Sequence, residues 1–90
     1  MKIKLSLTAP EYAPLIIHYD EFFHENHAYE FDWKYDVLPC VGDYISFGII
    51  KDLVKEHVDE IKLPEHWSIV DIKWNEAGDS VIPTLFIVGK

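Results

Sequence analysis

The chain has one cysteine, no arginine and no long hydrophobic run, and each absence excludes a class of protein. Because Cys40 is alone, no intrachain disulfide can form, which excludes the cross-linked framework of a small secreted domain. The first residues enter an alternating pattern without the apolar stretch of a signal peptide, and no segment has the length of a membrane span. We therefore expect a cytoplasmic protein that makes no contact with membranes.

Positive charge is also scarce. The chain has eight lysines against 16 acidic residues, which gives a formal net charge of −8 at pH 7. Nucleic-acid binding depends on clustered Lys and Arg, so no nucleic-acid partner is expected. The segment from Glu11 to Asp43 holds eight carboxylates and only one lysine, Lys34. This charge favours solubility, and it also suits an acidic decoy that imitates DNA toward a basic nucleic-acid-binding protein.

Apolar residues, in contrast, are plentiful. They make up 49% of the chain and include three Trp, five Tyr and five Phe. A chain of 90 residues without a repeat or linker suits one compact unit, so residues 1–90 are expected to form a single domain. Domains of this size bury a limited share of their surface, and dimerisation would add to their stability.

The clearest local pattern is the alternation of aromatic and charged residues from Tyr29 to Asp36. A period of two places successive side chains on opposite faces, which predicts a strand with an aromatic face and a charged face. Similar alternation predicts strands over residues 2–8, 44–47 and 67–74. In the last of these, one face is expected to carry Val70, Ile72 and Trp74.

The final strand, residues 80–88, is apolar on both sides, which predicts a position that is covered on both faces. Pro83 has no backbone N–H, so we expect a bulge or a locally free edge there. From Ala13 to Glu25 the residues fit a short helix or a strand, and the spacing of the apolar residues favours the helix.

A second helix is predicted over residues 49–61, where apolar residues and His57 form one stripe. Gly48 is its expected N-cap, and Pro64 stops it. Taken together, the patterns predict an α+β fold. It is expected to be a small, mostly antiparallel curled sheet or open barrel of about five strands with one or two helices.

A metal site is one hypothesis for function. Two imidazoles and a carboxylate can bind zinc and leave a position open for a substrate, as in hydrolytic zinc sites. The candidate ligands are His18, His24 and His27 with Asp20 or Glu21, and Glu25 lies beside them in sequence. Their spacing is not that of the H-E-x-x-H motif, and solvated histidines on an acidic loop are the alternative.

Other candidate catalytic groups lack the neighbours that their chemistry needs, so no catalytic residue is predicted. His57 is expected to be a core histidine, and Cys40 a structural thiol because its surroundings are acidic. Three carboxylates on the charged face of the aromatic strand are spaced like the acid/base pair of an inverting glycosidase, but a solvated face explains them better. They are Glu30, Asp32 and Asp36.

The aromatic face has two interpretations. Such a face usually belongs to the core, but the total of Trp and Tyr exceeds what a small core needs, and these residues anchor protein interfaces. The candidate partner-binding residues are Tyr29, Phe31, Trp33 and Tyr35.

Two motifs resemble those of small uncharacterised bacterial domains. Residues 38–45, Leu-Pro-Cys-Val-Gly-Asp-Tyr-Ile, resemble an L-P-x-V-G-D-x-I strand start, and residues 67–74, Trp-Ser-Ile-Val-Asp-Ile-Lys-Trp, resemble a W-x-V-x-x-I-x-W strand. The resemblance covers the C-terminal half and implies a barrel-like β unit without an assigned activity. The second motif departs from the pattern at Ile69 and Val70, and residues 49–61 would be an insertion.

The leading hypothesis is therefore a small, acidic, non-enzymatic domain without a cofactor. It would act through protein contacts as a homodimer or as an accessory subunit, using an aromatic-rich surface. The alternatives are the zinc-dependent site and the acidic decoy.

Overall fold

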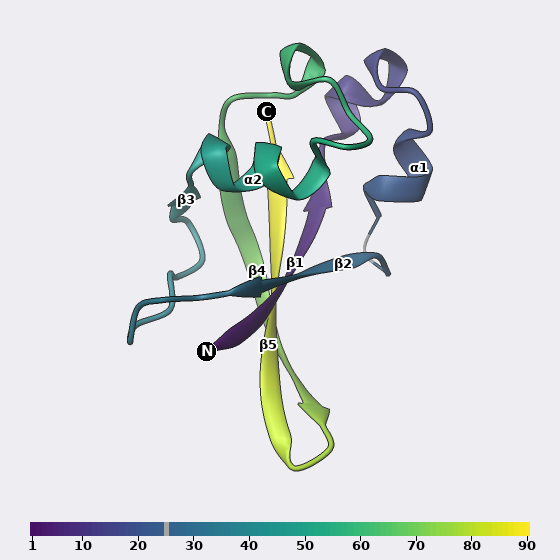
Figure 1. Cartoon of the computed structure of the whole chain (residues 1–90). Coiled ribbons are helices and arrows are strands. Elements are labelled where there is room, and N and C mark those ends of the chain that lie inside the picture. Colours follow the sequence, from purple (N-terminus) through teal and green to yellow (C-terminus); the bar gives the residue numbers. More distant parts are fainter. Residues whose placement is uncertain (25) are drawn as a thin grey trace.

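The computed structural model describes residues 1–24 and 26–90, and for residues 60 and 77 it describes the backbone without the side chain. The described residues form five strands and four short helical elements (Figure 1). In chain order they are β1 (Lys2–Thr8), η1 (Pro10–Leu15), α1 (Tyr19–Phe22), β2 (Ala28–Asp32), β3 (Tyr44–Ile45), α2 (Phe47–Val54), η2 (Glu60–Lys62), β4 (Trp67–Ala77) and β5 (Ser80–Gly89).

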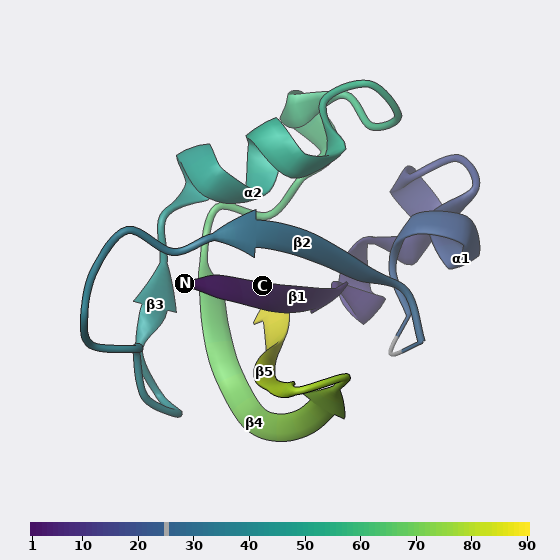
Figure 2. The same ribbon diagram turned by 60° about the horizontal axis from the view of Figure 1, so that its bottom comes forward.

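The strands form one mixed sheet in the order β2-β1-β5-β4-β3. Neighbours are antiparallel except for β1 and β5, which pair in parallel with Leu5 beside Leu85. The sheet curls into a half-barrel (Figure 2), which confirms the predicted small α+β fold with a curled sheet. Among the described residues, none of the helices has the length and hydrophobicity needed to span a bilayer.

The core lies on the face of the sheet that α2 covers. Alternation in β1 buries Ile3, Leu5 and Leu7, and Leu85 and Ile87 of β5 lie beside them. Ile50 and Val54 of α2 are also buried in this cluster. β5 is the middle strand of the sheet, and its core-facing residues Leu85 and Ile87 are buried. Phe86 and Val88 on the other face are only half-buried, so the predicted cover on both faces is complete on the core face alone.

β4 contains a bulge that the alternation did not predict. Ile69 pairs with Ile87 and Asp71 pairs with Phe86, so Val70 is the additional residue. Ile69 is buried and Val70 is exposed, which makes the prediction of Val70 on the face of Ile72 wrong. At Pro83, in contrast, the predicted free edge is present, because the ladder between β1 and β5 begins one residue later, at Thr84.

The helix predicted over residues 49–61 is shorter and begins earlier. Its N-cap is Ser46, whose Oγ accepts a hydrogen bond from the N–H of Gly48 at 3.3 Å, and α2 ends at Val54. A longer helix would place Glu56 and Asp59 near its C-terminus, where the helix macrodipole disfavours negative charge. The chain instead forms turns and then η2.

Residues 13–24 are helical in part, which favours the helix over the strand alternative. η1 and α1 are separate, and His18, with a φ of 58°, lies in the left-handed region between them. This break turns the apolar residues to different sides, so Ile16 and Phe23 are buried while Leu15 is exposed.

Candidate functional site

The aromatic strand predicted over residues 29–36 is divided into two parts. Tyr29 and Phe31 belong to β2 and lie opposite Leu5 and Ile3 of β1, where they are half-buried against the core. β2 ends at Asp32, the partner of Lys2 at the start of β1. The predicted strand, which extended to Asp36, is therefore too long.

The remaining aromatic residues lie in the segment from Trp33 to Tyr44, here called the β2–β3 segment. The Trp33 ring meets the Tyr35 ring edge-on, with 5.5 Å between centroids, and the Trp33 indole N–H donates to the carbonyl of Val37 at 2.9 Å. These contacts fold the segment back on itself, so Trp33 is half-buried while Tyr35 stays 71% exposed.

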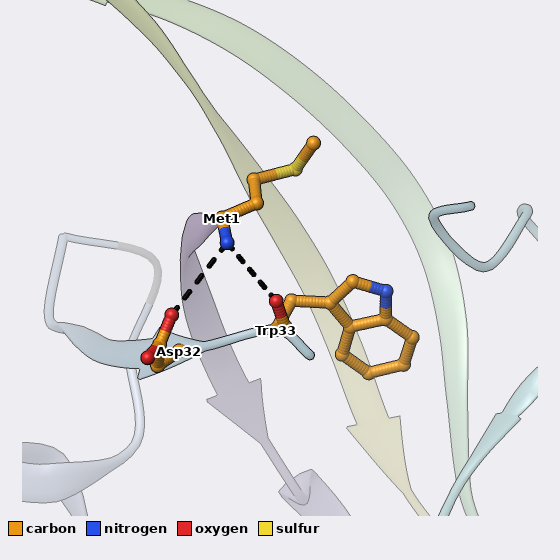
Figure 3. Close-up of polar contacts among 3 residues, drawn as sticks. All are labelled: Met1, Asp32 and Trp33. Carbon is orange, nitrogen blue, oxygen red and sulfur yellow. Dashed lines mark hydrogen bonds and ion pairs between the residues drawn. The ribbon is translucent and has the colours of Figure 1, made fainter. Parts of the chain in front are cut away.

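Both ends of the β2–β3 segment are attached to the sheet. At the first end, the Trp33 N–H donates to the Met1 carbonyl at 2.7 Å, and the Met1 ammonium lies 3.0 Å from the Trp33 carbonyl and 3.6 Å from Asp32 (Figure 3). At the other end, the Gly42 N–H donates to the Ile69 carbonyl at 2.8 Å. The segment is therefore held at a defined place beside the sheet.

The segment exposes a large apolar area. Val37 is 78% exposed and Tyr44 is 74% exposed, and Val41 is exposed as well. A hollow of about 220 Å³ adjoins it, lined by Phe31, Asp32, Trp33, Lys34, Tyr35 and Ile49. Several large apolar side chains exposed on one short segment are the kind of surface that marks interaction sites.

Carboxylates lie among these apolar side chains in the sequence. Asp32, Asp36 and Asp43 are exposed, and Asp43 accepts a hydrogen bond from the Cys40 N–H at 2.7 Å. Lys34 is the only basic side chain of the segment. The segment therefore combines exposed apolar side chains with more negative than positive charge, which suits a partner with an apolar contact and positive charge.

Val37, Val41 and Tyr44 were not among the candidate residues chosen from the sequence. Lys34-Tyr35-Asp36-Val37 continues the alternation of β2, so the pattern itself does not separate a strand from an exposed segment. Pro39 and Gly42 gave the available signal, because they mark a turn whose neighbours lie at the surface.

The structure only partly groups the proposed metal ligands. The rings of His24 and His27 lie 5.8 Å apart, while His18 lies at the start of α1 with its Nδ1 atom 3.7 Å from a carboxylate oxygen of Glu21. Nδ1 of His24 accepts the N–H of Asn26 at 3.1 Å, which occupies one of its two nitrogens.

Asp20 is on α1, and Glu25 lies outside the described residues. Within residues 1–24 and 26–90, no group of three or more His, Cys, Asp or Glu side chains has a geometry that could hold a metal ion. The zinc hypothesis stays a prediction.

The remaining candidates are surface groups. His57 is exposed and its ring stacks on Phe22 with centroids 4.4 Å apart, so the prediction of a core histidine is wrong. The early end of α2 is the reason, because His57 lies beyond the helix. Cys40 is an exposed free thiol, and the carboxylate of Glu30 is exposed like that of Asp32.

Tyr29 has an electrostatic role that the sequence did not indicate. Its hydroxyl donates to the Phe22 carbonyl at 3.1 Å, and burial raises the pKa of Tyr29 above its ordinary value of 10.0. A tyrosine whose pKa is raised by folding stabilises the native state fully below the unfolded pKa. This contribution is lost as the pH rises through the folded pKa.

We therefore expect the stability of the protein to fall above pH 10 and Tyr29→Phe to make this fall shallower. At pH 7 the variant should lose about 1 kcal/mol with the hydrogen bond to Phe22. Urea unfolding at a series of pH values measures both effects. Tyr35→Phe, at an exposed position, is the control, and an equal change in slope for the two variants would contradict the assignment.

Comparisons with protein-family models, with curated proteins and with solved structures each found no match to this chain.

Proposed function

We propose that the chain is a small non-enzymatic domain that binds a protein partner through the β2–β3 segment. The observation that carries the proposal is the exposure of Tyr35, Val37 and Tyr44 on a segment whose two ends are attached to the sheet. A held aromatic side chain loses little conformational freedom on binding, and Tyr and Trp dominate the energy of protein interfaces.

The charge of the segment favours a basic partner, to which this chain would be an accessory subunit. In a two-fold homodimer the same surface meets itself, so Asp36 and Asp43 of each copy would lie in one interface with their counterparts. Like charges at an interface disfavour association. A partner with Lys or Arg around an apolar centre avoids this repulsion, and a homodimer is the alternative.

We expect Tyr35→Ser and Tyr44→Ser each to weaken partner binding by about tenfold to thirtyfold, as removal of a central interface tyrosine does. Ile61→Ser is the matched control, because Ile61 is also highly exposed but lies on η2. The partner is first identified by affinity capture and mass spectrometry. Calorimetry with the purified partner then gives the dissociation constants of the three variants and the unchanged protein.

Each outcome distinguishes among the hypotheses. Equal loss for Ile61→Ser, or no loss for either tyrosine variant, would contradict the proposal. Binding that is lost when salt is added, and whose affinity is the same in both tyrosine variants as in the unchanged protein, would indicate the acidic decoy. If sedimentation shows self-association that depends on concentration and that Tyr35→Ser abolishes, the partner is a second copy of the chain and not a basic protein.

The zinc alternative is tested separately on the isolated protein. Saturable shifts of the His24 and His27 ring signals at micromolar zinc, absent in the His24→Gln variant, would support a metal site. Unchanged spectra would remove it, and neither result affects the binding assay with the tyrosine variants.

A further inference from the structure

A polar hollow lies on the face of the sheet opposite the core. It measures about 440 Å³ and is lined mainly by Lys4, Asn26, Lys73, Asn75, Thr84 and Phe86. Both charged side chains of its lining are lysines, although acidic residues outnumber lysines two to one in the whole chain. The hollow is therefore a local exception to the negative charge of the protein.

The register of the sheet places the two lysines on either side of Thr84. Lys4 of β1 and Lys73 of β4 are both paired with Thr84 of the central strand β5. Neighbouring strands lie about 4.8 Å apart, so the two lysine backbones are separated by about 10 Å. Two side chains of lysine length can close this distance and place both ammonium groups on one small ligand above Thr84.

Thr84 and Asn75 supply neutral hydrogen-bond donors at the floor of the hollow. Thr84 is only 7% exposed, and its Oγ1 accepts a hydrogen bond from the side-chain amide of Asn75 at 3.3 Å. Because the hydroxyl is the acceptor in that contact, its own hydrogen is left to donate, and within the described part of the chain it has no acceptor. A ligand with oxygen acceptors would satisfy it.

Two carboxylates near the hollow leave its lysines available. Glu30 is the register partner of Lys4 but forms no ion pair with it. An oxygen of Asp71, the register partner of Phe86, accepts the backbone N–H of Ile72 at 2.9 Å, and Asp71 forms no ion pair with Lys73. Within the residues that the structure describes, Lys4 and Lys73 have no anionic side chain as a partner.

We propose that this hollow binds a phosphate group, either free or as a phosphate monoester. The two ammonium groups match the charge of a phosphate monoester, which is close to −2 at neutral pH. The hydroxyl of Thr84 and the side-chain amide of Asn75 add donors for its remaining oxygens, and charge-assisted hydrogen bonds of this kind are the strong ones. The site is separate from the β2–β3 segment, so it does not depend on the proposed protein partner.

The test is a titration of the protein with inorganic phosphate, followed by amide NMR at constant ionic strength with chloride as the reference anion. We expect saturable shifts at Asn75 and Thr84, with a dissociation constant of about 1–10 mM, as suits a small ligand in an open site. Titration with O-phosphoserine then distinguishes an esterified from a free phosphate. Absence of saturation by phosphate, or identical shifts with chloride, would overturn the proposal.

Three variants locate the site. Lys4→Gln and Lys73→Gln should each weaken phosphate binding about fivefold to tenfold, and Thr84→Val should weaken it by a smaller factor while keeping the shape of the side chain. Lys62→Gln on η2 removes the same charge away from the hollow and should leave the affinity unchanged. Equal weakening by Lys62→Gln would show that net charge alone attracts the anion and would overturn the proposal. The amide spectrum of each variant shows whether it is folded.

Discussion

Replacing Trp67 by alanine is expected to lower the free energy of unfolding by about 3–5 kcal/mol, the range for buried tryptophans. Trp67 is the largest fully buried side chain, its ring lies 6.4 Å from that of Phe23, and its indole N–H donates to the carbonyl of Pro64 at 2.7 Å. The variant therefore loses packing and also leaves a buried carbonyl without its donor. Urea denaturation followed by circular dichroism measures the change.

Trp74 supplies a matched control on the same strand. It is 57% exposed, so Trp74→Ala should cost less than about 1 kcal/mol. If Trp67→Ala does not fold, Trp67→Phe keeps an aromatic ring while losing the hydrogen bond to Pro64 and part of the packing, with an expected cost of about 1–3 kcal/mol. Similar costs at positions 67 and 74 would contradict the packing described for β4.

Gly89→Ala is expected to destabilise the protein by about 1–3 kcal/mol through overpacking. Gly89 is the register partner of Trp67 across β4 and β5. A β-carbon at position 89 would lie 2.5 Å from Cγ of Pro64 and 2.8 Å from the Trp67 ring. Since both neighbours are buried and packed, the backbone of β5 has to shift, and thermal or urea unfolding would detect the loss.

A glycine-to-alanine substitution in α2 should have the opposite effect on stability. At Gly48 a β-carbon would meet only Oγ of Ser46, at the ordinary contact distance of 3.6 Å. Alanine loses less backbone entropy than glycine in a helix, so Gly48→Ala should stabilise the protein by about 0.5 kcal/mol. A neutral Gly89→Ala variant would show that position 89 is not enclosed by Pro64 and Trp67.

The local sequence pattern predicted where strands occur better than it predicted where each strand begins and ends. Alternation identified the buried apolar residues of β1 but not Ser6, which is buried as well. The two apolar sides of β5 predicted cover on both faces, and the side away from the core is only partly buried. The end of β2 depends on where β1 begins, namely at Lys2, which is the partner of Asp32. The bulge at Val70 depends on the register between β4 and β5. These are long-range relations, and periodicity within one segment carries no information about them.

The candidate site was likewise predicted in part from the local pattern. The sequence identified Trp33 and Tyr35 as partner-binding candidates, and both lie in the segment that the structure exposes or half-exposes. It grouped them with Tyr29 and Phe31 because all four share one period. The structure packs Tyr29, Phe31 and Trp33 against the core and leaves only Tyr35 of the four highly exposed. The placement of Lys4 and Lys73 on either side of Thr84 could not be predicted from the sequence, because it depends on the register of three strands that are far apart in the chain.

The parallel pairing of β1 with β5 has a consequence for the order in which the protein folds. Residues 4–8 must wait for residues 84–88, so the centre of the sheet cannot form until β5 has been synthesised. Closing so long a loop costs conformational entropy before any contact across it stabilises the chain, and folds rich in such distant contacts fold slowly. Until then β1 has only β2 as a neighbour, and its inner edge is open to pairing with other chains.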